Sequence, residues 1–445
     1  MKAKRTFKSL FWPTFIELLF FMLMGTIDTF MLSHFSDYAV GSVGNANTLI
    51  QMFGVLLLVV ANGVAVLVSQ YIGAKRSDEA QKIIGSGIII NALVGFILAV
   101  SLFILSGFLL GVVNTKPELF TDSNTYLQII AISLFFVAMS NVVTASLRSY
   151  GYAKYITYVV MAGNVLNIIG NYFLINGHWI FPRLGVYGAA LSTLIVRILM
   201  MLVYLVLLIK VIKFSFRNLK LDIESSKNIF RIGLPSAAES WTYTLMQGII
   251  LSMINGLGAE YTTARTYINT ILTYIYIFSL AFASANAVMT GYYIGERNYE
   301  KAHRETMKVA FRSLMVVLTM TLIVNFSSGL ILNFFSSNEV IVQTARKVLW
   351  IAILLEAGRS FNLILIQALR SAGDTSFPLM MAILSMFGIA IPVAYVLGVT
   401  LEVGLLGIYI AYTADELIRA GFMYIRWQSR KWESKSAYLE KSASS

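Results

Sequence analysis

Hydrophobic residues run along this chain in long stretches that charged residues rarely interrupt. Three of these stretches, 83–115, 126–147 and 377–401, each exceed the roughly 20 residues that cross a bilayer as a helix. A half-buried strand or an amphipathic surface helix would show polar positions at a period of about 2 or 3.6 residues instead. The pattern therefore predicts an all-α polytopic membrane protein.

The same reading along the whole chain predicts twelve membrane-spanning helices. Their expected ranges are 10–33, 45–71, 83–110, 126–147, 157–177, 185–209, 232–257, 266–292, 310–333, 348–369, 377–398 and 405–425. The first apolar run lacks a small-residue cleavage site, so we expect it to be the first span and not a cleaved signal.

The composition supports a membrane location and narrows the chemistry. Of the 445 residues, 58% are hydrophobic and only 13% are charged, whereas soluble proteins carry about a quarter charged residues. The absence of cysteine excludes disulfides and thiolate ligands, and the three histidines all fall in predicted connections. The sequence has no Walker loop, and no predicted span holds a histidine for a nucleophile triad. We therefore expect neither an enzyme nor an ATP-driven pump.

The net charge of +12 is distributed unevenly between the two sides of the predicted membrane. Most of the 34 lysines and arginines fall in the N-terminus, in the loops after every second span and in the C-terminal tail, with which Arg419 in the last turn of the twelfth span is counted. The opposite side holds Lys116, Arg183, Arg265, Arg346 and Lys347. This excess predicts a multi-pass plasma-membrane protein with both termini cytoplasmic. We expect the basic loops to meet anionic membrane lipids, and we expect no nucleic-acid partner.

A repeat with a constant offset of 222 residues divides the chain. LRSYG at 147–151 matches LRSAG at 369–373, and YIGAKRSDEA at 71–80 matches YIGERNYEKA at 293–302. The repeat predicts an N-terminal six-helix bundle over 1–209, a basic cytoplasmic linker over 210–231, a C-terminal six-helix bundle over 232–425 and a cytoplasmic tail over 426–445.

The number of spans in each half predicts the symmetry of the molecule. Because six is even, both halves run in the same direction and form a parallel repeat about an axis along the membrane normal. Two such bundles can rock about a central cavity, which favours a transporter.

Arg148 and Arg370 end the fourth span of each half, so each can anchor its span by reaching the head groups and the last unpaired carbonyls. The alternative role of these two arginines is gating between the bundles.

The second copy of the arginine motif, in full QALRSAGDTSFP at 367–378, resembles the signature of the multidrug and toxic compound extrusion (MATE) family. Other stretches similar to that family follow in order: IDTFMLSHF at 27–35, VSQYIGAKRSDEA at 68–80, GNVLNIIGNYFLI at 163–175 and DELIRAGFMYIRWQSRKW at 415–432. The resemblance covers essentially the whole chain.

The resemblance implies a V-shaped pair of six-helix bundles that exports organic cations or other amphipathic compounds in exchange for sodium or protons. It also implies a functional acid in the first span after a proline, which Pro13 and Asp28 match. The family often carries Asn-x-x-x-Asp in the fifth span, whereas this chain has Asn167 and Asn171. This departure argues against a relay of two aspartates. We expect a monomer with Na+ or H+ as coupling ion and no other cofactor.

A lipid-linked saccharide flippase of the same superfamily is the alternative function, and a receptor or scaffold is a third. A flippase would be expected to line its cavity with basic groups that bind a pyrophosphate. The predicted span interiors hold only Arg197 and Arg359, against at least four acids. The exporter is therefore the favoured reading.

Ionisable groups within spans cost about 2.5 to 3.5 kcal/mol each on insertion scales, so each needs a partner or a task. Asp28 shares one helical face with Glu17, and we expect it to bind the coupling cation or proton; a structural salt bridge or cap is the alternative. Glu17 and its repeat equivalent Glu239 are assigned to the substrate cavity, with a structural role at the bundle entrance as the alternative.

Three asparagines, Asn164, Asn167 and Asn171, line one face of the fifth span. The last two can complete a Na+ site with Asp28, or the amides can bond a neighbouring helix. In the second half, Glu356 and Arg359 lie three residues apart and can face each other.

The Glu356–Arg359 pair has two interpretations. The two charges either neutralise each other in the membrane, or Glu356 is a second coupling acid whose affinity for the coupling ion Arg359 tunes.

Tyr274 and Tyr276 on the eighth span are candidates for stacking on a cationic substrate in the cavity, with packing as the alternative.

Overall fold

The structure is a computed structural model that describes residues 6–113, 115–177 and 181–436. These residues form helices, turns and loops, and none of them lies in a strand. The helices gather into two compact units. The N-lobe holds the described residues up to Ile72 together with Arg76–Leu234, and the C-lobe holds Gly73–Lys75 and the described residues from Pro235 onward. The all-α fold in two helical bundles is as predicted.

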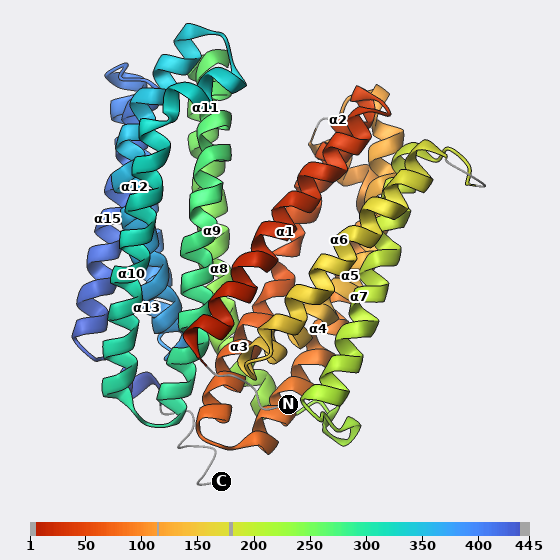
Figure 1. The fold of residues 1–445 in the computed structure, drawn as a ribbon, viewed down its shortest axis with the longest axis vertical. Helices are drawn as coiled ribbons and strands as arrows, with labels where there is room; N and C mark the ends of the chain where they lie inside the picture. Colours follow the sequence, from red (N-terminus) through yellow and green to blue (C-terminus); the bar gives the residue numbers. More distant parts are fainter. Residues whose placement is uncertain (1–5, 114, 178–180, 437–445) are drawn as a thin grey trace. The chain divides into compact units, whose positions relative to one another are not determined.

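The N-lobe is drawn in red to yellow-green in Figure 1. Its elements are α1 (Phe7–Ser33), α2 (Asp37–Gly54), α3 (Leu56–Gly73), α4 (Ser77–Val112), α5 (Pro117–Ser149), α6 (Ala153–Asn176), α7 (Gly185–Val211) and the short 3₁₀ turn η1 (Phe216–Asn218). The chain then passes from the N-lobe into the C-lobe within α8 (Ile223–Leu257).

The C-lobe continues in green to blue. Its elements after α8 are α9 (Ala259–Gly295), α10 (Tyr299–Phe326), α11 (Ser328–Phe335), α12 (Glu339–Ser371), α13 (Ser376–Ser385), η2 (Met386–Ala390), α14 (Ile391–Ala394), η3 (Tyr395–Thr400), α15 (Leu405–Gln428) and η4 (Glu433–Ser436). Part of the predicted tail, 437–445, lies outside the described residues.

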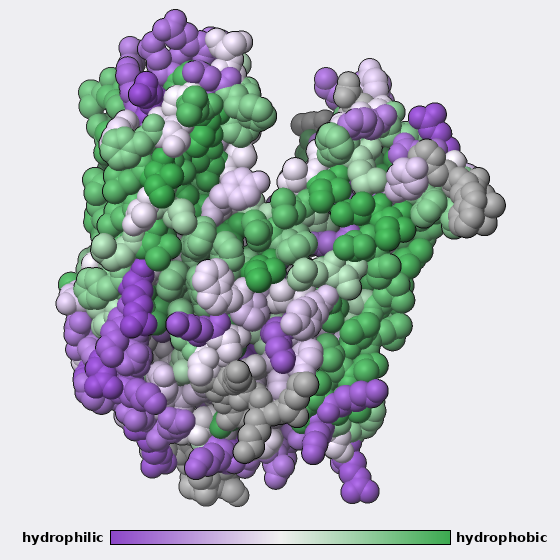
Figure 2. All heavy atoms as spheres, viewed as in Figure 1, coloured by the Kyte–Doolittle hydropathy of each residue, from purple (hydrophilic) through white to green (hydrophobic). Residues whose placement is uncertain are grey.

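Ten helical segments in the described part of the chain are long and apolar enough to cross a membrane. The remaining two of the twelve predicted spans correspond to α8, which holds Glu239, and α15, which holds Arg419. Hydrophobic side chains cover the middle of the visible face of each lobe, and hydrophilic ones gather towards the helix ends (Figure 2). Apolar side chains in the middle and polar ones at the ends are what a bilayer-embedded bundle requires.

The 222-residue offset is visible in the helices themselves. The bounds of α5, when shifted by 222 residues, coincide with those of α12. Each of these two helices lies in the buried core of its lobe, for example through Leu127 in α5 and its repeat equivalent Leu349 in α12. The two lobes are therefore built around equivalent central helices.

Several span boundaries differ from the sequence prediction. The seventh span was expected from 232, but α8 begins at Ile223 because Asp222 caps its first turn: the backbone N–H of Ser225 donates to Asp222 Oδ2 at 2.7 Å. Hydrogen bonding from Ser225 holds the pKa of the Asp222 carboxyl below its ordinary value. The ninth span was expected from 310, but α10 begins at Tyr299, where the Asn298 side chain accepts from the Lys301 N–H.

Three predicted spans are interrupted, and the ninth span is divided into α10 and α11 at Ser327. The second span is divided into α2 and α3 at Val55, directly after Gly54, a residue type with weak helix propensity. The eleventh span contains two π-helical turns, η2 and η3, on either side of the short helix α14. Pro392 in α14 lacks a backbone N–H, which explains why the regular hydrogen-bond ladder is interrupted there.

The repeated Leu-Arg-Ser-x-Gly motif is a helix stop. Gly151 is left-handed at φ 86°, and its N–H donates to the Arg148 carbonyl at 2.9 Å. The Tyr152 N–H donates to the Leu147 carbonyl, also at 2.9 Å, which completes a Schellman motif. The second copy repeats both bonds around Gly373, at φ 83°. Backbone N–H groups thus donate to these carbonyls. The prediction that the side chains of the two arginines bind them is wrong.

The two arginines instead pair with the two glutamates near the start of each half. Arg148 Nη2 lies 2.8 Å from Glu17 Oε2, and Arg370 Nη2 lies 2.8 Å from Glu239 Oε2. The first pair joins α5 to α1, and the second joins α12 to α8. Because both partners recur at the same offset, the ion pair belongs to the repeat and holds each bundle at equivalent points.

We expect these pairs to stabilise each lobe. Arg148→Gln should cost about 2 kcal/mol, because it leaves the Glu17 carboxylate unpaired while 18% of that side chain is exposed. The double change Glu17→Gln/Arg148→Gln should recover most of this loss, since it removes both charges. Thermal unfolding of the purified variants measures both effects, and Glu239→Gln/Arg370→Gln repeats the test in the C-lobe. Additive losses in the double variants would contradict this account.

Candidate functional site

A ladder of three hydrogen bonds at seven-residue intervals on α6 positions α1 in the N-lobe. The Thr157 hydroxyl donates to the Pro13 carbonyl at 2.8 Å, and the Asn164 amide donates to the Phe20 carbonyl at 2.8 Å. At the third position, the Asn171 amide donates to the Asp28 side chain, Nδ2 to Oδ1, at 2.7 Å. Residues seven apart share a helix face, so this spacing directs α6 onto α1 and brings an amide to the carboxylate.

The structure therefore brings together the predicted residues Asp28, Asn167 and Asn171. Asn171 Nδ2 also donates to Asn167 Oδ1 at 3.3 Å, and Asn167 lies against the Ser192 and Thr193 hydroxyls of α7 at 3.4 Å. Asn164 uses its amide to bond a neighbouring helix. Asn164 thus takes the helix-bonding role proposed for this face, whereas ion binding by Asn167 and Asn171 stays a prediction.

The oxygen atoms around Asp28 suit a hard cation or a proton. Asn171 Oδ1 is buried and has no hydrogen-bond partner, although its amide nitrogen donates to Asp28. Carboxylate and amide oxygens are the ligands that hard cations prefer. Within the described ranges, no lysine, arginine or histidine nitrogen lies within 4.0 Å of the Asp28 carboxylate. Arg197 acts on it at longer range while donating to the Ser133 hydroxyl at 2.7 Å.

The C-lobe contains a buried charge cluster. Glu356 is fully buried, and its Oε1 accepts from Arg359 Nη1 at 2.5 Å, so the predicted pair is formed. Arg359 Nε also lies 3.6 Å from Glu416 Oε1 on α15. The pair therefore does not neutralise itself in isolation, because a second carboxylate shares the guanidinium.

Three members of this cluster were not foreseen as site residues. Arg419 Nη2 lies 2.7 Å from Asp415 Oδ2 and 2.9 Å from Glu416 Oε1. Arg419 is 4% exposed, so its placement with the cytoplasmic charges is corrected: α15 continues to Gln428, which leaves Arg419 inside the bundle. The spacing of Asp415, Glu416 and Arg419 on one helix was the available signal.

The cluster holds three carboxylates and two guanidinium groups, so fully ionised it carries one excess negative charge. Glu356 Oε2 and Asn362 Oδ1 are buried without hydrogen-bond partners, while Asn362 Nδ2 donates to Glu416 Oε2 at 2.9 Å. A buried acceptor without a donor is costly. The arrangement can therefore take up one proton or small cation.

Aromatic and amide groups extend the C-lobe cluster. The Arg359 guanidinium lies over the Tyr276 ring at 5.9 Å, whereas Tyr274 is 44% exposed. Gln247 accepts from the Tyr412 hydroxyl at 2.8 Å and donates to the Tyr243 hydroxyl at 2.8 Å. The Gln247 network was not predicted, because a single uncharged polar residue in a span gives little indication of its partners.

The coupling candidates differ from the other charged residues in their relation to the repeat. The repeated ion pairs join Glu17 to Arg148 in the N-lobe and Glu239 to Arg370 in the C-lobe. At the same offset, Asp28 corresponds to Ile250 and Glu356 corresponds to Leu134, and both of these are buried apolar residues. Asp28 and Glu356 are therefore features of one lobe each and not of the common scaffold.

Two other features bear on ligand binding. A groove of about 530 Å³ is lined by α1 residues on either side of Asp28 in sequence: Met22, Gly25, Thr26, Thr29, Phe30 and Ser33. In the described residues, no group of three or more histidine, aspartate or glutamate side chains is arranged to hold a metal ion. The Asp28 site, with one carboxylate and amide oxygens, is not a site of that type.

Comparison with known proteins shows similarity along almost the whole chain. The MatE family model matches residues 13–173 and 235–396, one match in each half. The chain is 35% identical to the uncharacterized transporter YisQ of Bacillus subtilis (strain 168) over 97% of this chain and 96% of that protein. It is 27% identical to the probable multidrug resistance protein NorM of Thermotoga maritima over 93% of this chain and 90% of that protein.

A solved structure supports the fold. It is a multidrug resistance MATE family transporter of the MOP superfamily in an outward-facing conformation, with a TM-score of 0.86, 20% identity and 96% coverage of each chain. At that identity the likeness concerns the fold alone. The family model and the YisQ relative carry the assignment: this chain belongs to the MatE family and is a multi-pass membrane transporter, not an enzyme.

Proposed function

We propose that this transporter is an antiporter that exports organic cations and other amphipathic small molecules in exchange for Na+ or H+. The observation that carries the proposal is the Asp28 carboxylate, which lies at membrane depth beside two asparagines without a cationic partner in the described structure. The names of relatives, such as the probable multidrug resistance protein NorM, support small-molecule drugs as the substrate class.

A charge inside a membrane span is costly unless it is balanced there. An aspartate in a span needs a counter-charge, and amide dipoles alone supply it only in part. A cation or proton from solution completes the site, and the orphaned Asn171 Oδ1 offers a further ligand. An ion that binds one conformation more tightly than the other shifts the balance between the conformations, which is what coupling to export requires.

The C-lobe cluster is the second element of the proposal. Glu356 carries an unpartnered buried oxygen and belongs to a cluster with one excess carboxylate. Proton or cation uptake there would change the charge balance around Arg359 and the Tyr276 ring that the guanidinium covers. We therefore keep Glu356 as a second coupling acid, with Arg359 tuning its affinity.

The polarity of the membrane-embedded groups favours cationic substrates. Each of the buried arginines Arg359 and Arg419 is engaged by carboxylates, and Arg197 donates to Ser133, so no basic cavity suited to a pyrophosphate is evident among the described residues. Tyr274, with its exposed ring, remains a candidate for stacking on a cationic substrate. The flippase is accordingly not favoured.

The direct test is efflux of ethidium from proteoliposomes in which a sodium gradient and a proton gradient are imposed separately. We expect efflux with one gradient and background rates without it. Export that proceeds equally with neither gradient would contradict the antiporter, and absence of any flux in an active preparation would favour a receptor.

Asp28→Asn should reduce gradient-driven efflux to the rate of protein-free liposomes. The change keeps the size of the side chain and its contact with Asn171 but removes the charge that an exchanged cation or proton needs. Membrane insertion should remain normal, because removal of an intramembrane charge relieves insertion cost. Asp122→Asn is the matched control, since Asp122 is exposed near the start of α5 and should leave efflux unchanged. Wild-type efflux by Asp28→Asn would show that the N-lobe coupling site is wrong.

Glu356→Gln should impair efflux and also lower expression, because it removes the closest partner of Arg359 and leaves only the 3.6 Å contact with Glu416. The double change Glu356→Gln/Arg359→Gln should restore expression without restoring efflux. Membrane yield and efflux per molecule separate the two effects. Full efflux by the double variant would show that the Glu356–Arg359 pair stabilises the protein and takes no part in coupling.

A further inference from the structure

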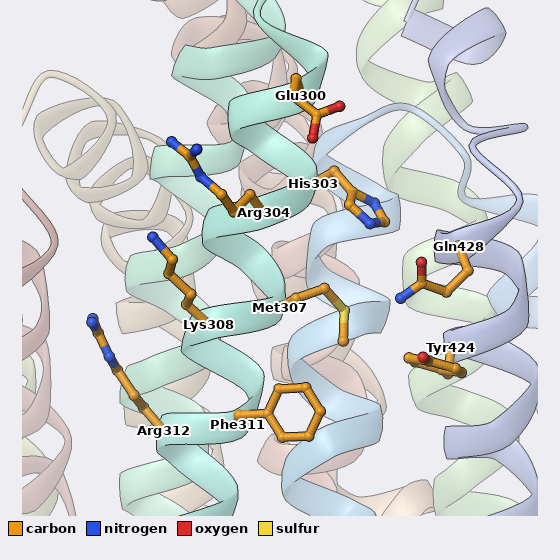
Figure 3. Close-up of a pocket in the computed structure, with 9 residues that line it drawn as sticks. All are labelled: Glu300, His303, Arg304, Met307, Lys308, Phe311, Arg312, Tyr424 and Gln428. Atoms are coloured by element: carbon orange, nitrogen blue, oxygen red, sulfur yellow. The ribbon is translucent and has the colours of Figure 1, made fainter.

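A groove of about 560 Å³ lies between α10 and α15 in the C-lobe, and its lining shares no residue with the charge cluster (Figure 3). Residues of both helices line it, among them Arg304, Lys308, Phe311 and Arg312 of α10 and Tyr424 of α15. The groove lies at the end of the C-lobe where the positive-charge bias predicts the cytoplasmic face. The coupling mechanism does not use any of these residues.

One edge of the groove is a column of basic side chains. Arg304, Lys308 and Arg312 follow one another at four-residue spacing, which places them on one face of α10 over about 12 Å. Figure 3 shows the three cationic ends projecting to one side of α10, whereas Met307 and Phe311 point from its other side towards α15. The side chains of Arg304 and Lys308 are 62% and 47% exposed, so both are accessible to a ligand.

The nearby acids do not cancel this charge. Glu305 lies 2.8 Å from Lys308 Nζ and 3.6 Å from Arg304 Nε, so one carboxylate serves two cations. Glu300 is paired with Arg430 at the other end of the groove. Within the described part of the chain, no carboxylate oxygen lies within 4.0 Å of the Arg312 guanidinium. The column therefore retains a surplus of positive charge.

The floor beside the column is aromatic and continues along exposed apolar side chains of α10. Phe311 contacts Phe361 edge to face at 5.7 Å between ring centroids, and Phe361 lies 6.1 Å from the Tyr424 ring. Met315, one turn beyond Phe311, is 63% exposed, and Leu322 further along is 39% exposed. An apolar track thus runs from the basic column into the span.

The α15 side of the groove is held in place by stacked rings. Trp427 stacks on Trp432 at 4.3 Å, and the His303 ring lies parallel to Trp427 at 6.0 Å. Trp427 and Trp432 are fully buried, and the indole N–H of Trp432 donates to the Trp427 carbonyl at 3.0 Å. A wall fixed in this way presents a preformed surface to a ligand.

We propose that this groove binds one anionic phospholipid, with its phosphate on Arg304, Lys308 and Arg312 and an acyl chain along Phe311 and Met315. Charge complementarity selects the anionic head group, because a phosphate between closely spaced cations gains charge-assisted hydrogen bonds. The apolar track selects a lipid over a free phosphate, since a soluble anion leaves Phe311 and Met315 uncovered. The site lies within one lobe and does not depend on the proposed transport function.

Native mass spectrometry of the purified full chain tests the site by titration with phosphatidylglycerol, with phosphatidylcholine as the neutral lipid and glycerol 3-phosphate as the head group alone. The triple change Arg304→Gln/Lys308→Gln/Arg312→Gln removes the column. The matched control is Lys213→Gln/Arg217→Gln/Lys220→Gln, which removes three exposed charges from the N-lobe connector around η1.

We expect one phosphatidylglycerol to be retained by the wild type and the control, and its apparent Kd to rise roughly 10-fold or more in the triple variant. Phosphatidylcholine should bind weakly to all three proteins, and glycerol 3-phosphate should not displace the lipid at equal concentration. If the triple variant proves misfolded by its melting temperature, Arg312→Gln alone should raise the Kd about 5-fold, because Arg312 makes no ion pair with another described residue whose loss would disturb the fold.

Three results would overturn the proposal. Equal phosphatidylglycerol binding by the wild type and the basic-column variants would exclude the column as the head-group site. Equal retention of phosphatidylcholine by the wild type would show that charge does not select the ligand. Displacement by glycerol 3-phosphate at equal concentration would identify a site for a soluble phosphate and not for a lipid.

Discussion

The structure depends throughout on one constraint, which is that a charge placed at membrane depth must be balanced there. Most embedded carboxylates are balanced by arginine: Glu17 by Arg148, Glu239 by Arg370, and the α12 and α15 acids by Arg359 and Arg419. Asp28 is the exception in the described chain, because its close polar contact is the Asn171 amide. A transported cation or proton is the natural complement to that site.

The duplication of the chain separates scaffold from function. The ion pair between the first and fourth spans and the glycine helix stop after the arginine both recur at the same offset, so both lobes use them for construction. Asp28 and Glu356 replace positions that are apolar in the opposite lobe, at Ile250 and Leu134. The lobes thus share a framework and differ in the charged groups that they hold inside it.

The apolar runs and the 222-residue offset were enough to predict the helical bundles, because span length and repetition are properties of local sequence. The helix breaks at Val55 and around Pro392 were missed, since they depend on a few residues inside otherwise apolar runs. The Glu17–Arg148 pair joins residues 131 positions apart, and only the matching recurrence of both residues hinted at it. Prediction of the burial of Arg419 would have required the position at which α15 ends, and hydropathy does not determine that position.

The central claim is that the missing counter-charge of Asp28 is an ion taken from solution and exchanged for substrate. The most direct test adds ethidium to purified protein and records proton release in weak buffer together with displacement of bound radioactive sodium. The account predicts that the wild type releases about one more proton or sodium ion per chain than Asp28→Asn does. Undiminished release by Asp28→Asn would contradict it.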